Sequence, residues 1–227
     1  MKTIIKILLS ISIVLLSYMC VMSILTPIRF DATKESREKV IIKRLTDIRK
    51  VELEYRDQKG RFTGSFDTLI SFVKQARKKV VMKEGTLTDK QLDAGLTEAK
   101  AVKIVHSGNA KEIAENGLQG FVRDTAYVNM IKAVFPNDYT PETIDQLAVI
   151  PFSNNEKFTL KVKNDYVNSA GIVIPLFEAS ATYKSYLFDL NHQEMLNAID
   201  LQDKLNKFPG LQVGSIDEPN NNAGNWE

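Results

Sequence analysis

ILLSISIVLLSYMCVMSIL, residues 7–25, is the stretch on which the fold of this chain depends. No charged residue lies between Lys6 and Arg29. As a helix, these 19 residues extend about 29 Å, close to the ~30 Å of bilayer hydrocarbon. Eleven of them are Ile, Leu or Val, which favour membrane insertion by about 3–7 kcal/mol. The stretch predicts a transmembrane helix, and Pro27 is expected to stop the helix or to mark its exit.

Cys20, inside this stretch, raises the alternatives of a lipoprotein and of a cleaved signal peptide. A signal-peptide cleavage site is a set of small residues, and residues 15–30 contain no alanine. Lipid attachment needs a small residue before the cysteine, but Met19 precedes Cys20. We therefore expect an uncleaved single-pass anchor in which Cys20 is an ordinary apolar side chain. It is also the only cysteine, which excludes a disulfide within the chain.

The charges that flank the apolar run leave two orientations open. Lys2 and Lys6 precede it, whereas six basic residues between Arg29 and Arg44 follow it. The positive-inside rule would keep the C-terminal side in the cytoplasm, but long domains translocate largely regardless of charge. A short basic leader before an apolar run also resembles an uncleaved export signal. We expect a protein of the bacterial inner membrane, with most of the chain on the extracytoplasmic side.

The composition predicts a globular α+β chain after the anchor. Charged residues make up 26% and hydrophobic residues 44% of the sequence, which excludes a disordered chain. The formal net charge of +2 provides no field that would attract nucleic acid. We predict the following organisation: a short tail at 1–6, the anchor at 7–26, a stalk helix at 27–60, a mainly helical region at 61–135, an α+β region at 136–217 and a polar tail at 218–227.

The stalk carries an apolar stripe with the period of a helix. Ile41, Leu45, Ile48 and Tyr55 fall at steps of three and four, with Val51 or Glu52 completing the series. The stripe either packs on the chain's own domain or forms a coiled-coil seam with a partner helix. In the second alternative, Ile41, Leu45 and Ile48 contact the partner.

Two further helices are expected in the middle of the chain. Ser65 can cap a helix over residues 66–80, whose last turns are rich in lysine and arginine and so complement the helix dipole or meet anionic lipid headgroups. Thr88 and Gln91 resemble a capping box for a helix over residues 88–105. Residues 121–135 could be strand or helix.

The C-terminal part shows strand patterns with helices between them. KFTLKVK at 157–163 and FEASATYK at 177–184 alternate in polarity, and LQVGSI at 211–216 reads as a last strand. Thr140-Pro141-Glu142 predicts a helix start. Asn191 and Glu194 predict a capping box, opening a helix on which Ala198, Leu201, Leu205 and Phe208 share a face. Helices followed by strands with packed helices predict an α+β fold with a C-terminal mixed antiparallel sheet.

The last ten residues, EPNNNAGNWE, contain the only tryptophan, Trp226. A polar terminus commonly frays. A tryptophan, however, supplies a large apolar area and an N–H donor, and consecutive asparagines tolerate left-handed turns. We expect the tail to dock, either on its own domain or on a partner, with Asn222 and Trp226 as candidate contacts.

Residues 1–72 resemble a type IV pilin or pseudopilin, in which a hydrophobic helix runs into an amphipathic one. The resemblance extends to Tyr55-x4-Gly60-x-Phe62 and a following leucine such as Leu69. No Gly or Ala precedes the apolar run and no Glu lies within it, so we expect neither peptidase processing nor pilus-type polymerisation. The outline is also similar to assembly-platform proteins of pilus and secretion machines, and the ending NNNAGNWE resembles a set of uncharacterised bacterial single-pass membrane proteins. These resemblances imply surface assembly or secretion and carry over no catalytic residue.

The sequence contains no motif for catalysis, a cofactor or a metal. His106 and His192 are the only histidines, and no C-x-x-C or H-x3-H spacing exists. His106 and Ser107 could act as base and nucleophile, but adjacent side chains rarely meet and no G-x-S-x-G elbow is present. P-loop, dinucleotide-binding and EF-hand motifs are absent from the sequence.

These observations favour a non-enzymatic, membrane-anchored envelope protein. We expect it to bind other envelope proteins in a secretion or surface-assembly machine, without cofactor, metal or nucleic acid. The alternative is a membrane-tethered enzyme or small-ligand-binding domain whose site is built from scattered residues.

Overall fold

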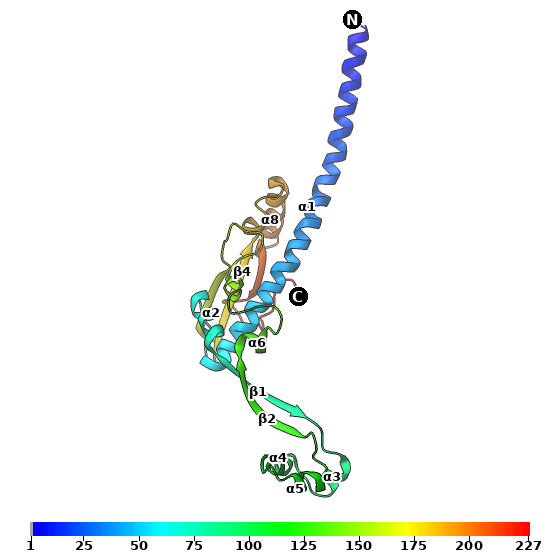
Figure 1. The fold of residues 1–227 in the computed structure, drawn as a ribbon. Coiled ribbons are helices and arrows are strands. Elements are labelled where there is room, and N and C mark those ends of the chain that lie inside the picture. Colours follow the sequence, from blue (N-terminus) through cyan, green and yellow to red (C-terminus); the bar gives the residue numbers. More distant parts are fainter. Residues whose placement is uncertain (1) are drawn as a thin grey trace. The chain divides into compact units, whose positions relative to one another are not determined.

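The computed structural model describes residues 2–227, without the side chains of Lys2, Val81, Met82 and residues 124–126. The chain divides into two compact units. Unit 1 consists of Met1–Phe72 and Thr140–Glu227, and unit 2 of Val73–Tyr139. Unit 1 contains a sheet of order β3-β4-β5 and unit 2 a ribbon of order β1-β2 (Figure 1). A long apolar N-terminal helix and a C-terminal antiparallel sheet confirm the α+β class.

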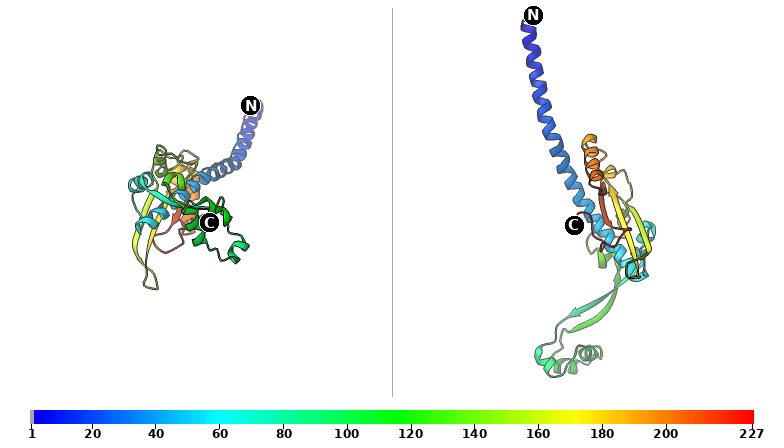
Figure 2. Two further views of the ribbon diagram at one scale, coloured as in Figure 1. Left: turned by 60° about the horizontal axis from the view of Figure 1, so that its bottom comes forward. Right: turned by 180° about the vertical axis from the view of Figure 1, so that it is seen from behind.

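Helix α1 (Lys2–Lys59) is continuous and contains Pro27. Pro27 therefore does not stop the helix, and of the two alternatives only the exit from the span remains. A proline removes one backbone hydrogen bond and usually kinks a helix, but helix-forming residues on both sides and tertiary packing after Phe30 continue it here. The N-terminal part of α1 projects from unit 1, whereas the C-terminal part lies along the sheet (Figures 1 and 2).

The C-terminal part of α1 packs into the core of unit 1. Ile41, Leu45, Ile48 and Val51 are completely buried, and the helix contacts β4 and β5. Full burial of one such side chain stabilises a fold by roughly 1.5–3 kcal/mol. The apolar stripe therefore packs on the chain's own domain, which is the first of the two alternatives that its period allowed.

The sheet of unit 1 is antiparallel. Its strands are β3 (Thr159–Val167), β4 (Val173–Thr182) and β5 (Gly210–Gly214). Thr159 pairs with Ser180, and Glu178 pairs with Gly214. Residues 176–181 of the central strand are buried without alternation, because α1 covers one face and β3 and β5 flank the strand. The three strands predicted from the C-terminal part of the sequence are thus confirmed.

Short helices complete unit 1. They are η1 (Ile144–Ala148), α7 (Tyr183–Tyr186) and α8 (His192–Lys204). Asn191 caps α8 by accepting a hydrogen bond from Glu194 N at 3.1 Å, which is the first half of the predicted capping box. The Glu194 side chain accepts from Asn197 Nδ2 at 3.3 Å. The shared apolar face of α8 is not covered at its C-terminal end: Met195 is buried, whereas Leu201 and Leu205 are 57% and 53% exposed. The helix start expected at Thr140-Pro141-Glu142 is a turn, and η1 begins only after Thr143.

The helix predicted over residues 66–80 is shorter than expected. Helix α2 (Phe66–Gln75) ends after Lys74, and the basic residues Arg77, Lys78 and Lys79 lie in β1 (Arg77–Glu84). Strand β1 pairs with β2 (Val122–Asn129), with Arg77 opposite Asn129 and Glu84 opposite Val122. The Met130 N–H donates to Ala76 O at 3.1 Å and closes this end of the ribbon. A stretch that could be helix by local pattern is strand because a partner strand pairs with it.

Three small helices between β1 and β2 enclose a second core. They are α3 (Asp89–Asp93), α4 (Glu98–His106) and α5 (Ala110–Glu115). The core contains Leu96, Ala101, Leu118 and Phe121. The single helix predicted over 88–105 is divided in two, because Gly95 has a left-handed φ of 79°. Helix α6 (Met130–Val134) follows β2, so residues 121–135 are both strand and helix.

Candidate functional site

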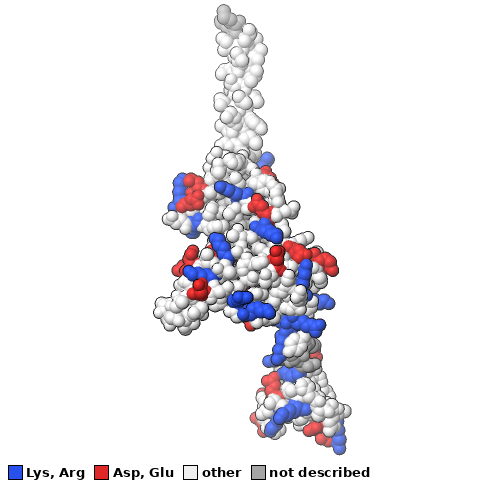
Figure 3. Space-filling model, turned by 90° about the vertical axis from the view of Figure 1, so that its left-hand side faces the viewer, with Lys and Arg blue, Asp and Glu red and all other residues white. Residues whose placement is uncertain are grey.

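The N-terminal part of α1 presents apolar side chains on every side. Apart from Met22, the large apolar residues from Ile4 to Ile24 have exposed fractions between 53% and 69%. This part of the helix is long and apolar enough to cross a membrane. On the face that Figure 3 shows, no lysine, arginine or acidic side chain is visible between the grey N-terminal residues and the point where the rest of unit 1 begins. An apolar surface of this extent requires a cover other than water.

Below the exposed part, α1 is clamped to the loop before α8. Arg37 Nη1 lies 2.6 Å from Asp189 Oδ1, and Nη2 lies 2.7 Å from Oδ2. Arg37 Nη1 also donates to Tyr186 O at 2.6 Å. The hydrogen bond from Arg37 holds the pKa of the Asp189 carboxyl below its usual range. A bidentate pair of this kind fixes both position and orientation, so the loop is held against the helix.

A polar cavity of about 450 Å³ lies between α1, α7 and β5. Lys34, Glu38 and Tyr183 contribute to its lining. Lys34 Nζ lies 3.6 Å from Glu38 Oε1 and 5.2 Å from the centroid of the Tyr183 ring. The Tyr186 hydroxyl donates to Glu38 Oε1 at 3.3 Å. The cavity therefore places a cation, a carboxyl and a phenol together.

Partial burial raises the pKa values of Glu38 and Tyr183, two of the residues that line this cavity. Desolvation raises the pKa of Glu38, although Lys34 and the Tyr186 hydroxyl oppose the shift. Desolvation, with the nearby Glu38 charge, raises the pKa of Tyr183 to about 12. These groups can hold a small polar molecule by hydrogen bonds and charge, but the described lining of this cavity contains no cysteine, serine or histidine nucleophile.

The polar tail docks on its own domain along β5. Gly214 N donates to Ala223 O at 2.9 Å, and Asn225 N donates to Gln212 O at 2.9 Å. Asn225 Nδ2 donates to Gly210 O at 2.9 Å. The tail therefore covers the edge of β5, an edge that could otherwise pair with another strand.

The tail is also tied to α1 by Arg49. Its Nη1 atom donates to Asn222 O at 3.0 Å and lies 2.7 Å from Glu227 Oε1. Asn221 and Asn222 take left-handed φ values of 54° and 57°, the conformation that consecutive asparagines tolerate. Trp226 is half-buried and lies over Gly224. Asn222 and Trp226 thus make their contacts within the chain.

The other residues singled out in the sequence lie apart from one another. Ile41, Leu45 and Ile48 are completely buried in unit 1 and are not available at its surface. The Ser107 hydroxyl donates to Ile104 O at 2.7 Å, so the described contacts of Ser107 do not form a base–nucleophile pair with the exposed His106. Among the described residues, no group of three or more His, Cys, Asp or Glu side chains could hold a metal ion.

Glu52 is an unusual residue that sequence reasoning did not single out. It is completely buried in unit 1, and Thr63 N donates to its Oε2 atom at 3.2 Å. Its Oε1 atom has no hydrogen-bond partner. Burial raises the pKa of the Glu52 carboxyl to about 8. The signal in the sequence was its position beside Val51 on the apolar stripe.

Unit 2 has a cavity of its own, about 610 Å³ in volume, between α3, α4 and α5. Lys90, Lys100 and Lys103 line it together with Glu112 and Glu115. Two of its polar lining side chains bond to nearby backbone: Lys100 Nζ donates to Gly95 O at 3.0 Å, and the Gln91 amide donates to Asn116 O at 2.6 Å. The charges are mixed and do not define one ligand class.

No protein-family model, curated protein or solved structure matches this chain. The function is therefore inferred from the geometry of unit 1, with the apolar part of α1 as its most extensive exposed feature.

Proposed function

We propose that this chain is a membrane-anchored bacterial envelope protein that acts through contacts with other proteins and performs no chemistry of its own. The observation that carries the proposal is the division of α1. Its first part is apolar and exposed on all sides, whereas its second part is buried against a folded domain. Such a helix fixes a globular domain directly at a membrane surface, without a flexible linker.

The setting that we propose is a secretion or surface-assembly machine of the inner membrane, with unit 1 and unit 2 on the extracytoplasmic side. The resemblance of residues 1–72 to pilins and pseudopilins supports this setting, as does the outline shared with assembly-platform proteins. The partners would then meet surfaces other than the apolar stripe, because Ile41, Leu45 and Ile48 are buried within the chain.

Membrane flotation, protease protection and crosslinking of the full chain test this proposal. We expect the chain to float with membranes after alkaline extraction and to be digested from the extracytoplasmic side in spheroplasts. Crosslinking in intact membranes should capture defined envelope proteins. A chain that remains in the soluble fraction after alkaline extraction would exclude the anchor, and a chain protected in spheroplasts would reverse the orientation.

A second candidate function is small-ligand binding in the polar cavity of unit 1. The observation that favours it is the grouping of Lys34, Glu38 and Tyr183 around a volume of about 450 Å³, which suits a small zwitterion. Thermal-shift measurements with a panel of free amino acids test this candidate. Binding should raise the melting temperature of the wild-type chain and not that of Glu38→Gln. If no member of the panel stabilises the protein, zwitterion binding is excluded.

A further inference from the structure

A small cavity lies where α1 leaves the predicted membrane span. Its volume is about 200 Å³, and it is lined by Thr26, Arg29, Phe30 and Thr33 of α1 and by Leu190 and Asn191 of the loop before α8. Phe30 is buried, whereas Arg29 and Asn191 are exposed. The cavity thus joins an apolar side chain to a guanidinium, hydroxyls and a carboxamide.

The depth of this cavity follows from the length of the helix. The apolar run ends at Leu25, and each helical residue adds about 1.5 Å along the axis. Thr26 and Arg29 therefore lie within about 6 Å of the end of the run. The headgroup layer on each side of the hydrocarbon is roughly 5–7 Å thick. In a bilayer that covers residues 7–25, the cavity opens at the level of the headgroups.

The polar groups of the cavity suit a phosphodiester. The planar guanidinium of Arg29 can donate two parallel hydrogen bonds to phosphate oxygens. The Thr26 hydroxyl and the Asn191 amide add neutral donors. The Thr33 hydroxyl donates to Arg29 O at 2.9 Å and so fixes its own rotamer beside the cavity.

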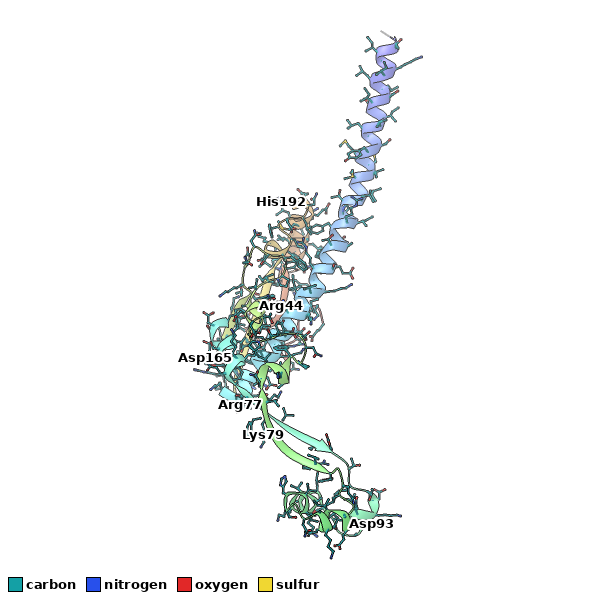
Figure 4. The ribbon with its side chains drawn as sticks, viewed as in Figure 1. Arg44, Arg77, Lys79, Asp93, Asp165 and His192 are labelled. Atoms are coloured by element: carbon teal, nitrogen blue, oxygen red, sulfur yellow. The ribbon has the colours of Figure 1, made fainter. Side chains whose placement is uncertain are left out.

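The loop that forms the far wall is rigidly placed. The Arg37–Asp189 pair, with distances of 2.6 and 2.7 Å, holds the residue next to Leu190 on α1. The same pair occupies the Asp189 carboxylate, which would otherwise repel an anion beside the cavity. Phe188, in the same loop, is 44% exposed, as an interfacial apolar contact would require. Figure 4 shows His192, which follows Asn191, at the end of unit 1 nearest the projecting part of α1.

We propose that this cavity binds the phosphodiester group of a membrane phospholipid and docks the Leu190–Asn191 loop onto the membrane surface. The inference rests on the proposed membrane anchoring and adds a lipid contact to it. The acyl chains of the bound lipid run along the apolar part of α1, while Arg29 holds the phosphate. The folded domain then has a fixed tilt at the membrane rather than turning freely on its anchor.

Lipid retention by the full chain in detergent tests the phosphate contact. The probes are phosphatidylglycerol and monogalactosyldiacylglycerol, which lacks phosphate, and the bound lipid is counted by native mass spectrometry. We expect wild-type protein to retain phosphatidylglycerol preferentially and Arg29→Gln to retain it about tenfold less well, as loss of one charge-assisted contact predicts. The matched control is Lys39→Gln on the same helix, whose ion pair with Glu35 is exposed; it should behave as wild type. Equal retention by Arg29→Gln and wild type, or equal retention of the two lipids, overturns the proposal.

Fluorescence quenching in vesicles separates a failure of this proposal from a failure of the anchor. A fluorophore on the native Cys20 should be quenched by nitroxides in the acyl chains; if it is not, the anchor itself is excluded. In a Cys20→Ser background, a fluorophore at His192→Cys should be quenched by headgroup nitroxides, and one at the distant Asp165→Cys should not. Quenching at Cys20 with none at His192→Cys retains the anchor and overturns the docking of the loop.

Discussion

Arg49 Nη1 lies 2.7 Å from Glu227 Oε1 and joins the packed part of α1 to the polar tail. The same nitrogen donates to Asn222 O at 3.0 Å, so one side chain holds the tail at two points. The tail in turn pairs with β5 through Gly214 and Gln212. Helix, edge strand and tail therefore form one continuous layer of contacts, although 178 positions separate Arg49 from Glu227.

Removal of residues 218–227 should destabilise unit 1. Two backbone hydrogen bonds and two hydrogen bonds of the Asn225 side chain join this tail to β5. At about 0.5–1.5 kcal/mol each, we expect a loss of roughly 2–6 kcal/mol and a lower melting temperature. Thermal unfolding of the full chain in detergent, followed by circular dichroism, measures the effect. Glu227→Gln is the matched control, since it keeps the tail and should cost less than about 1 kcal/mol. A deletion with an unchanged melting temperature would show that the tail contributes nothing.

Glu52→Gln should change the pH dependence of stability. The pKa of Glu52 is about 8 in the folded protein, above its ordinary value of 4.5, so the folded state binds the proton more tightly than the unfolded state. The contribution of protonated Glu52 to the free energy of unfolding is fully present below about pH 4.5. It is lost as the pH rises towards 8. Glutamine stays neutral, so the variant should be more stable than wild type at pH 8–9, by on the order of a few kcal/mol.

Urea unfolding at several pH values measures this difference. Asp57→Asn is the control, because Asp57 is an exposed carboxylate on the same helix, and its pH profile should follow that of wild type. Parallel profiles for wild type and Glu52→Gln between pH 5 and 8 would contradict the burial of an unpaired carboxyl.

Gly214→Ala should destabilise the protein more than Gly60→Ala does. Both variants strain the backbone, but only Gly214→Ala adds a steric clash. Both glycines have a φ of 73°, which costs an alanine about 1 kcal/mol. A Cβ at Gly60 would meet open space, whereas one at Gly214 would meet the Phe177 carbonyl oxygen. We expect Gly60→Ala to lose about 1 kcal/mol and Gly214→Ala at least twice as much. If chemical denaturation gives the same loss of unfolding free energy for both variants, β5 moves away from the Phe177 carbonyl at no cost in stability, and the expected clash is absent.

Cys20→Ser should leave membrane association unchanged. Cys20 is exposed on the apolar part of α1, where no small residue precedes it, so it is one lipid-facing side chain among many. Flotation and electrophoretic mobility of the variant should match those of wild type. Incorporation of a labelled lipid precursor into wild type, lost in the variant, would instead identify a lipoprotein.

The sequence by itself determined the membrane span, the cap of α8 and the apolar stripe of α1, because these features depend on neighbouring residues. The apolar run of residues 7–25 predicts a span because its length and composition alone decide whether it can cross a bilayer. Asn191 caps α8 through a neighbour three residues away, and the stripe from Ile41 to Tyr55 is buried as its period requires. In each case the decisive contacts lie within a few residues or follow from periodicity.

Only the tertiary structure decided the features that depend on distant partners. Residues 77–84 became a strand because they pair with β2, from Arg77 with Asn129 to Glu84 with Val122, and no local pattern contains so distant a partner. Leu201 and Leu205 share a face of α8 but are 57% and 53% exposed, because helical period shows which residues share a face and not whether another element covers that face. The docking of the tail through Asn225 and the burial of Glu52, whose Oε2 atom accepts from Thr63 N, likewise depend on tertiary packing, since burial is a property of the whole packed unit and not of a segment.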